Sequence, residues 1–262
     1  MNDDAFEFHA GRTALLISVP HAGLAVPDDI RARLTPAALR FPDTDWHVPL
    51  LYEACREIGA SMLIARNSRY VVDLNRPPDG TPLYPGQTET ALCPTRSFGG
   101  HALYQSGQEP GPAELRTRLE HHWQPYHLKL AEVADTLRTQ HGHCVLWDAH
   151  SIKSNVPAFF AGKLPDLNVG SADGRSCSRS LSDRVMQQLR SQSRFTSILN
   201  GRFKGGYITR HYGDPARGVD ALQLEIAQSA YLDEAAPQHF DSDRAAALRT
   251  LLYQLLAAVT NV

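Results

Sequence analysis

Apolar runs of strand length alternate along this chain with longer helical segments, and this order restricts the fold more than any other feature. The runs "TALLISV", "CVLWDAHS" and "VDALQLEIA" have the length and composition of buried strands. Helical patterns follow them at residues 112–142, 177–191 and 241–258. Strands that alternate with helices favour a parallel sheet covered by those helices. We therefore expect an α/β fold with helices on both faces of the sheet.

Two segments near the middle of the N-terminal half have clear local signals. Asp43 is expected to cap a helix that runs to about residue 60, because its carboxylate can accept hydrogen bonds from free backbone N–H groups. The stretch "YVVDLNRPP" is expected to be a strand that Pro77 and Pro78 end.

Loops and helix ends are also readable from the sequence. Gly142 is expected to end the long helix that begins near residue 112, and Pro125 stands where it would kink that helix. Residues 164–178 have the composition of a loop. Residues 76–112 show little periodicity, so residues 77–111 are expected to form either a lid or a surface loop.

Length, charge and cysteine usage limit the class of protein. A chain of 262 residues can bury a core without disulfides, and we expect one domain over residues 1–262. The formal net charge of −2, without long charged runs, argues against nucleic acid or an anionic membrane as a partner. The four cysteines are dispersed, no apolar run is long enough to cross a bilayer, and the acidic N-terminus lacks a signal-peptide pattern. We expect a cytoplasmic protein, with its oligomeric state left open.

Polar side chains occur repeatedly where the expected strands end. His21 follows the first strand, and Asp148 and His150 end "CVLWDAHS". Asp73, Asn75 and Arg76 end "YVVDLNR", and Glu225 lies late in "VDALQLEIA". In open α/β sheets, ligands bind at the carboxyl ends of the strands. These residues are therefore candidates for one reactive site, although each histidine alone could equally be a hydrogen-bonded structural residue.

The strand-end histidines indicate a metal centre. A hydrolytic zinc site uses three nitrogen or oxygen ligands and keeps one position open for water. His21, His150 and one carboxylate would complete such a set. Within "DTDWH", Asp45 is the preferred third ligand and His47 the reserve, because Asp43 is expected to cap the helix. These ligand types suit zinc best, but cobalt, nickel and iron remain open.

Carboxylates and cations around this centre have candidate roles of their own. Glu225 lies inside an apolar run and is either a general base for the metal-activated water or the partner of an arginine. Asp148 either orients the His150 imidazole or is an ordinary acid at a strand end.

Cationic residues that could bind a carboxylate lie on two segments. "SRYVVDLNRPP" contributes Arg69, Asn75 and Arg76, and arginine matches a carboxylate with two hydrogen bonds. "GGYITRHYG" adds Arg210 and His211, which are either a second anion site or part of a surface hairpin.

Taken together, these motifs resemble the N-formylglutamate amidohydrolase family. The matching blocks, in order, are "SVPHAG", "DTDWHV", "SRYVVDLNRPP", "WDAHS", "LPDLNVGSADGRSCS", "GGYITRHYG" and "LQLEIAQSAY", and they extend over residues 14–232. The resemblance implies a phosphorylase/hydrolase-like α/β fold of three layers, with a mixed and mostly parallel sheet, that is related to the zinc carboxypeptidases. It also implies one divalent metal, most consistent with Zn²⁺, and hydrolysis of N-formyl-L-glutamate to formate and L-glutamate in a histidine degradation route.

The resemblance assigns roles by position. It implies that His21, Asp45 and His150 bind the metal and that Glu225 is the general base. Asn75 and Arg76 would bind a substrate carboxylate, and Arg69 would polarise the scissile carbonyl. One departure concerns the third metal ligand: carboxypeptidases use an H-x-x-E pair, whereas "HAGL" has Leu24 at the Glu position.

Two other functions are compatible with the same residues. A metal-dependent hydrolase could act on another N-acylamino acid or on a carboxypeptidase-like substrate. A non-catalytic protein that binds small dicarboxylates would need the cationic residues but neither a metal nor Glu225.

Overall fold

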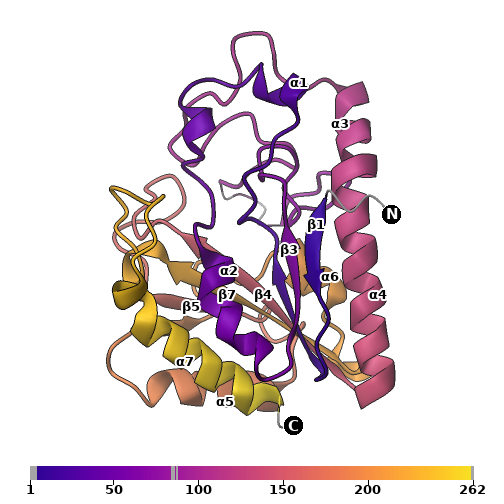
Figure 1. The fold of residues 1–262 in the computed structure, drawn as a ribbon, viewed down its shortest axis with the longest axis vertical. Helices are drawn as coiled ribbons and strands as arrows, with labels where there is room; N and C mark the ends of the chain where they lie inside the picture. The colour runs from indigo at the N-terminus through magenta and orange to yellow at the C-terminus, as the bar shows by residue number, and fades with distance from the viewer. Residues whose placement is uncertain (1–4, 84–85, 87, 261–262) are drawn as a thin grey trace.

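A single seven-stranded sheet runs through the computed structural model, which describes residues 5–83, 86 and 88–260 (Figure 1). The strand order across the sheet is β1-β3-β2-β4-β7-β5-β6. The strands are β1 (Phe6–His9), β2 (Leu15–Val19), β3 (Ser61–Ala65), β4 (Cys144–Ile152), β5 (Leu167–Gly170), β6 (Ser197–Leu199) and β7 (Val219–Ala227).

The pairing of these strands is mixed but mostly parallel. β3, β2, β4 and β7 run parallel to their neighbours in the middle of the sheet. β1 pairs antiparallel with β3, and β5 pairs antiparallel with β7 and parallel with β6. The expected α/β architecture is therefore confirmed.

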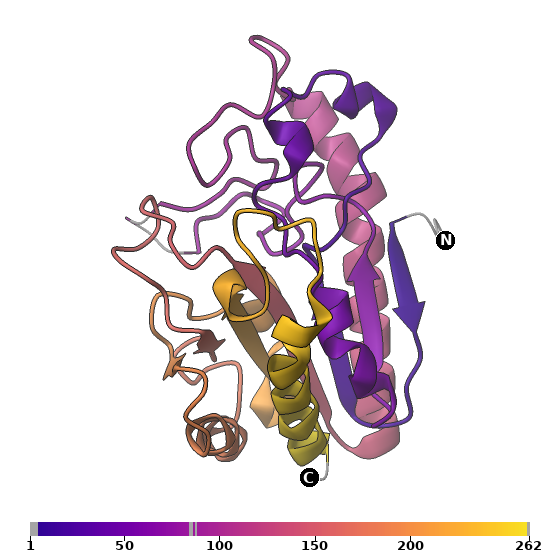
Figure 2. The same cartoon turned by 60° about the vertical axis from the view of Figure 1, so that its left-hand side comes forward.

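Helices cover both faces of the sheet (Figures 1 and 2). One face carries α3 (Pro112–Arg118), the π-helical turn η3 (Leu119–Trp123), α4 (Gln124–His141) and α6 (Tyr207–Tyr212). The other face carries α2 (Val48–Tyr52), α5 (Arg179–Arg190) and α7 (Ser242–Thr260). The remaining helical pieces are α1 (Asp28–Arg31), η1 (Ala38–Arg40), η2 (Glu53–Arg56), η4 (Pro215–Arg217) and η5 (Gln228–Ala230).

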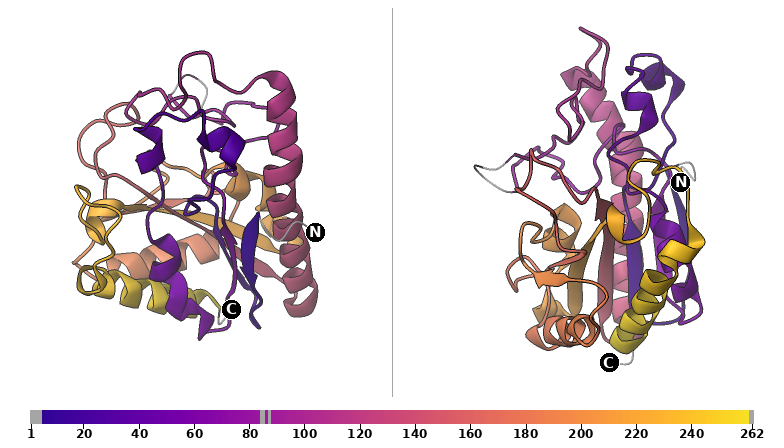
Figure 3. Two further views of the ribbon diagram at one scale, coloured as in Figure 1. Left: turned by 45° about the horizontal axis from the view of Figure 1, so that its top comes forward. Right: turned by 90° about the vertical axis from the view of Figure 1, so that its left-hand side faces the viewer.

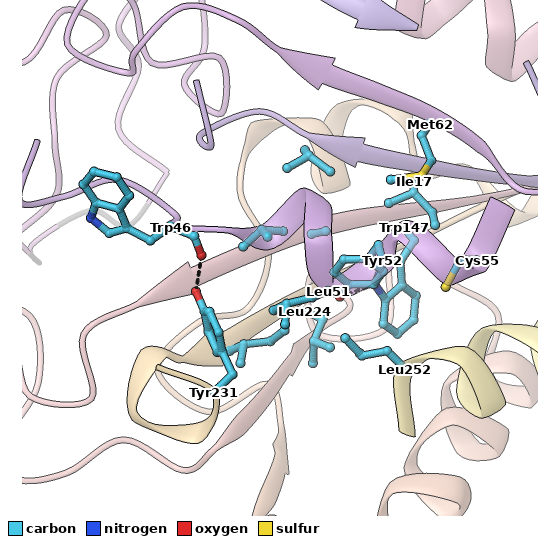
Figure 4. Close-up of a cluster of buried hydrophobic side chains, with 14 of the residues drawn as sticks. Ile17, Trp46, Leu51, Tyr52, Cys55, Met62, Trp147, Leu224, Tyr231 and Leu252 are labelled. Carbon is cyan, nitrogen blue, oxygen red and sulfur yellow. Dashed lines mark hydrogen bonds between the residues drawn. The ribbon is translucent and has the colours of Figure 1, made fainter. Parts of the chain in front are cut away.

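Alternation along the central strands divides the core into two layers. Ile17 and Trp147 face the layer of α2 and α7, whereas Leu16 and Leu146 face the layer of α4. Figure 4 shows the first layer, where the Trp147 indole N–H donates to the Tyr52 hydroxyl at 3.0 Å. On the face of α4, the same alternation leaves Asp148 and His150 on one side of β4, as expected from the sequence.

The long helix has the expected ends but an irregular middle. Gly142 ends it in the left-handed region with φ 80°. Between α3 and α4, η3 widens the helix by one residue just before Pro125. The interruption predicted at the proline is therefore a π-helical turn.

The predicted strand at residues 70–78 is wrong, because this segment is an irregular loop after β3. Its backbone carbonyls bind side chains of the long helix instead of a neighbouring strand. Arg118 donates to the carbonyls of Tyr70 and Val71, Trp123 to that of Arg76, and the His127 ring lies 2.9 Å from that of Leu74. Val72 and Leu74 pack into the layer of this helix, and Tyr70 and Val71 into the other core layer. The apolar pattern of the loop therefore reflects burial and not strand pairing.

Two further expectations are corrected. Asp43 does not cap a helix: α2 begins later, and the Asp43 carboxylate accepts hydrogen bonds from the Tyr70 hydroxyl at 2.8 Å and the Phe98 N–H at 3.0 Å. The predicted loop at residues 164–178 contains β5, a short strand at the antiparallel edge.

The connection between β3 and α3 is the longest in the described chain. It lies above the sheet in Figure 1, and it lies at the top and upper left of the right-hand view of Figure 3. Residues 84, 85 and 87 of the expected lid or surface loop lie outside the described residues. Among the helices that the structure describes, none is long and apolar enough to cross a membrane.

Candidate active site

Side chains from the ends of three parallel strands meet on the α4 face of the sheet. His21 follows β2, while His150 and Glu225 lie near the ends of β4 and β7. β4 and β7 are paired with His150 directly opposite Glu225, so both side chains point to the same face of the sheet. Asp45 joins them from the segment before α2. The polar residues at the strand ends thus form one site.

The two histidines and Asp45 form a buried cluster whose ligand atoms lie within 4.8 Å of one another. Oδ2 of Asp45 is 2.9 Å from Nδ1 of His150 and 3.8 Å from Nδ1 of His21. The two imidazole rings lie 4.8 Å apart between centroids. One ring nitrogen of each histidine therefore faces a shared carboxylate oxygen.

The other ring nitrogen of each histidine faces a second carboxylate. Nε2 of His21 lies 2.8 Å from Oδ1 of Asp73, and Nε2 of His150 lies 3.0 Å from Oδ2 of Asp148. Ser18 donates to the other oxygen of Asp148 at 3.2 Å. Outer carboxylates of this kind fix the orientation of a metal-binding histidine and make it a stronger ligand. Asp148 thus occupies the orienting position that was one of its two expected roles.

Burial and the neighbouring charges perturb the protonation of this cluster. Burial, together with the positive charge of Arg69, lowers the pKa of His21. Burial alone would also lower the pKa of His150, but Asp148 and Asp45 raise it well above its usual value. Burial would raise the pKa of Asp73, but His21 and Arg69 hold it well below the ordinary range. Three buried aspartates, Asp45, Asp73 and Asp148, surround the two histidines, and Arg69 is the buried arginine beside them. This excess of negative charge favours a bound cation.

This donor set fits a divalent metal ion. Two imidazole nitrogens and one carboxylate oxygen converge, and each imidazole is backed by a carboxylate. The reserve ligand His47 does not join the cluster, because its Nε2 lies 3.0 Å from the Pro237 carbonyl oxygen. Asp43 is also outside it, bound to Tyr70 and Phe98.

Glu225 is buried beside this cluster. Burial raises its pKa to about 8. The Gln223 amide, two residues earlier on the same face of β7, donates to Oε2 of Glu225 at 3.1 Å. Within the described residues, no ion pair joins Glu225 to an arginine, which was the alternative to a catalytic role. The position is that of a carboxyl group able to exchange a proton near neutral pH.

Arg69 is held rigidly at the edge of the site. Its Nη2 donates to Oδ2 of Asp73 at 2.6 Å, and its Nη1 lies 3.8 Å from Oδ1 of Asp45. The guanidinium lies 4.7 Å from the centroid of the Phe98 ring. Its buried Nε finds no hydrogen-bond partner in the part of the chain that the structure describes. Arg69 therefore keeps one N–H for another acceptor.

A cavity of about 580 Å³, counted with the part open to solvent, is lined by His21, Asp45, Arg69, His150, Gln223 and Glu225. The cationic residues that line it are Arg69, Arg76 and Arg202. Arg76 is anchored by hydrogen bonds from Nε to the Thr90 carbonyl at 2.7 Å and from Nη2 to the Thr90 hydroxyl at 3.0 Å.

Asn75 also lines the cavity, but its side chain has partners inside the protein. Its amide nitrogen donates to Oδ2 of Asp148 at 2.9 Å, and its Oδ1 accepts the N–H of Ile208 at 2.8 Å. Asn75 thereby ties the outer carboxylate of His150 to the start of α6.

The structure does not bring Arg210 and His211 to this cavity. Nε of Arg210 donates to the Gly205 carbonyl, and its side chain lines a separate surface hollow with Arg175 and Ser176. His211 is exposed and stacks on Tyr207. Their place in the second half of α6 turns them away, while Gly206 at its start lines the cavity.

Sequence reasoning gave no role to three residues of the site, namely Asp73, Gln223 and Arg202. Asp73 is among the polar residues expected at a strand end, but without a role of its own. Gln223 could have been found, because it shares the period-two alternation of Glu225. Arg202 lies in a loop whose sequence has no comparable signal.

Comparison with known proteins agrees with the geometry of the site. A sequence profile of the N-formylglutamate amidohydrolase family matches residues 13–232. Over 257 residues, the chain is 48% identical to N-formylglutamate deformylase from Pseudomonas putida and 46% identical to N-formylglutamate deformylase from Pseudomonas aeruginosa. Each of these alignments covers 98% of this chain and 96% of the relative.

Solved structures give the same result. The crystal structure of N-formylglutamate amidohydrolase from Ralstonia eutropha JMP134 is similar with a TM-score of 0.85 and 26% identity, covering 98% of this chain and 99% of that one. A gene product from Agrobacterium tumefaciens shares the fold with a TM-score of 0.71 and 19% identity, over 98% and 96% of the two chains. The chain therefore belongs to the N-formylglutamate amidohydrolase family.

Proposed function

We propose that this protein hydrolyses N-formyl-L-glutamate to formate and L-glutamate. The observation that carries the proposal is the convergence of His21, Asp45, His150 and Glu225 in one cavity that arginines also line. The two Pseudomonas relatives, both named N-formylglutamate deformylase, support the same substrate. With this substrate, the reaction would belong to a histidine degradation route.

In this proposal, His21, Asp45 and His150 hold one divalent metal ion, most consistent with Zn²⁺. When bound, such an ion acts as a Lewis acid that polarises a carbonyl group and lowers the pKa of a water molecule. Asp73 and Asp148 orient the two imidazoles so that their Nδ1 atoms face the carboxylate of Asp45.

Glu225 moves the proton. As a carboxylate it takes a proton from the attacking water, and as a carboxylic acid it returns this proton to the departing amine of glutamate. Its raised pKa of about 8 suits both directions of transfer near neutral pH. Gln223 supports this exchange by holding one carboxyl oxygen in place.

Arg69 stabilises the oxyanion that forms when water attacks the formyl carbon. Its buried Nε–H has no partner in the described chain, and its ion pair with Asp73 keeps the guanidinium from turning. A preorganised donor of this kind favours the transition state because little reorganisation accompanies the charge. Arg76 binds a carboxylate of the substrate from the wall of the cavity, and Asn75 lies beside it in the same wall.

Formate release from N-formyl-L-glutamate tests the proposal. Wild-type protein should lose activity on treatment with a chelator and regain it with Zn²⁺, with Co²⁺, Ni²⁺ and Fe²⁺ assayed in parallel. Glu225→Gln keeps the shape and the hydrogen bond of the side chain but cannot accept a proton. It should bind metal as wild type does and lose about 100-fold or more in kcat.

Three outcomes would contradict this function. Formate release unaffected by complete metal removal would exclude the metal role. Near-normal turnover of a metal-loaded Glu225→Gln variant would exclude Glu225 as the base. Faster turnover of N-acetyl-L-glutamate or of a peptide would show that the enzyme acts on another acyl group.

A further inference from the structure

Arg202 lines the same cavity as the candidate metal ligands, although it comes from a distant loop between β6 and α6. Its guanidinium is anchored on two other loops. Nε donates to the Phe159 carbonyl at 2.7 Å, and Nη2 donates to the Thr88 carbonyl at 3.2 Å. The rings of Phe159 and Phe203 lie 5.9 Å and 5.4 Å from it. These contacts hold the positive charge in a defined position.

Arg202 and Arg76 bind the same short piece of chain. Arg76 donates to the carbonyl of Thr90, and Arg202 donates to the carbonyl of Thr88. A chain extends by at most about 3.6 Å per residue, so the Cα atoms of Thr88 and Thr90 are roughly 7 Å apart or less. The two guanidinium groups therefore bind the same stretch of the cavity wall.

Two other charged side chains of the cavity have partners within the protein. Arg69 is committed to Asp73 and lies close to Asp45. The carboxylate of Glu89, which also lines the cavity, accepts hydrogen bonds from the backbone N–H of Leu83. A ligand with two negative groups separated by a short carbon chain matches two neighbouring cations on one wall.

We propose that Arg202 binds the side-chain carboxylate of the substrate and thereby selects acidic N-formylamino acids over neutral ones. Arg76 takes the α-carboxylate, because it follows Asn75, whose amide binds Asp148 behind His150 and so lies beside the reacting centre. The carboxylate at the far end of glutamate, three carbon atoms away, then reaches Arg202. This inference rests on the proposed function and assigns the substrate specificity of that same site.

The test compares N-formyl-L-glutamate with N-formyl-L-glutamine, which has the same shape but a neutral side chain. Wild type should prefer the glutamate substrate in kcat/KM. Arg202→Met should lower kcat/KM for formylglutamate by roughly 10- to 100-fold, mainly through KM, because one charge-assisted contact is lost. Its kcat/KM for formylglutamine should stay within about 3-fold of wild type. Arg202→Lys, which keeps the charge, should retain part of the preference.

Activity towards formylglutamine also reports whether each variant is folded. If Arg202→Met kept the wild-type ratio of the two activities, the charge would not determine the preference and the inference would be overturned. If both variants lost the two activities in proportion, Arg202 would be a structural residue and the inference would be overturned. Arg210→Met is made in parallel to decide between Arg202 and Arg210. If Arg210→Met lost the preference for formylglutamate and Arg202→Met kept it, the inference would also be overturned. Absence of formate release from either substrate by wild type would instead refute the proposed function.

Discussion

Asp73 is the buried carboxylate on which both His21 and Arg69 depend. Oδ1 lies 2.8 Å from Nε2 of His21, and Oδ2 accepts a hydrogen bond from Arg69 at 2.6 Å. Asp148 stands in the same relation to His150 but forms no ion pair with an arginine among the described residues. Asp73→Asn and Asp148→Asn are therefore a matched pair, since each keeps the shape of the side chain and removes one negative charge.

Both variants should bind the metal more weakly, but Asp73→Asn should also lose stability and more of its activity. Loss of an outer carboxylate typically weakens metal binding 10- to 100-fold, or about 1.4 to 2.7 kcal/mol, and both variants should show it. Asp73→Asn also leaves the buried Arg69 without its nearest counter-charge. Removing one partner of a buried ion pair costs about 3 to 5 kcal/mol, and the asparagine oxygen can keep one hydrogen bond, so about 3 kcal/mol is expected. Asp73→Asn should thus lose activity through two routes and Asp148→Asn mainly through one.

Three measurements separate these effects. Competition with a chelator gives the Zn²⁺ affinity, urea unfolding of the metal-free proteins gives the free energy of unfolding, and formate release at saturating Zn²⁺ gives kcat. With metal saturating, Asp148→Asn should recover most of its kcat, whereas Asp73→Asn should stay low because Arg69 has lost its support. Wild-type Zn²⁺ affinity in both variants would refute the assignment of the two histidines as ligands backed by carboxylates.

Three further changes test other parts of the structure. In Gly206→Ala, a Cβ would lie 2.4 Å from the Asn75 amide, so kcat/KM should fall about 100-fold; Gly111→Ala, at an extended position with open space, is the control, and equal activity of the two would contradict the contact. Arg118→Met should lower the free energy of unfolding in urea by about 2 to 6 kcal/mol, because two buried carbonyls lose their donor at about 1 to 3 kcal/mol each, and a loss under about 1 kcal/mol would contradict this. Burial lowers the pKa of His127 from 6.5 to about 3, so below pH 6.5 the unfolded chain takes up a proton that the folded chain does not. Stability should then fall by up to about 1.4 kcal/mol per pH unit towards pH 3, and His127→Gln should flatten this slope in urea unfolding between pH 4 and 7; an unchanged slope would exclude the group.

The parts of the site that lie on strands could be predicted from the sequence. The periodicity of β4 and β7 places His150 and Glu225 on one face near the strand ends, and both are there. His21 follows β2 in the same way. Strand direction and alternation are local properties, so they determine which side chains meet at the carboxyl edge of the sheet. A single domain over residues 1–262 and a cytoplasmic location stay predictions.

The parts that depend on contacts between distant segments could not be predicted. Aspartate is a residue type typical of helix N-caps, but the donors to Asp43 are the Tyr70 hydroxyl and the Phe98 N–H, which come from elsewhere in the chain. Arg210 follows a glycine pair that resembles an anion-binding loop, yet the short helix α6 turns it away from the cavity. Arg202 enters the cavity because loops around Phe159 fix it there, a tertiary effect with no local pattern.

The π-helical turn η3 makes the site dependent on the number of residues in a helix of the outer layer. Arg118 and His127 both bind the loop after β3, and η3 lies between them with one residue more than an α-helical turn would hold. In a regular helix, the nine positions from Arg118 to His127 would place the two side chains about 180° apart, so they could not reach one loop together. The extra residue in η3 takes up about 100° of this rotation and brings both side chains towards the same side of the helix. A relative that lacks one residue of this turn should therefore have a regular helix there and could still present both side chains to the loop.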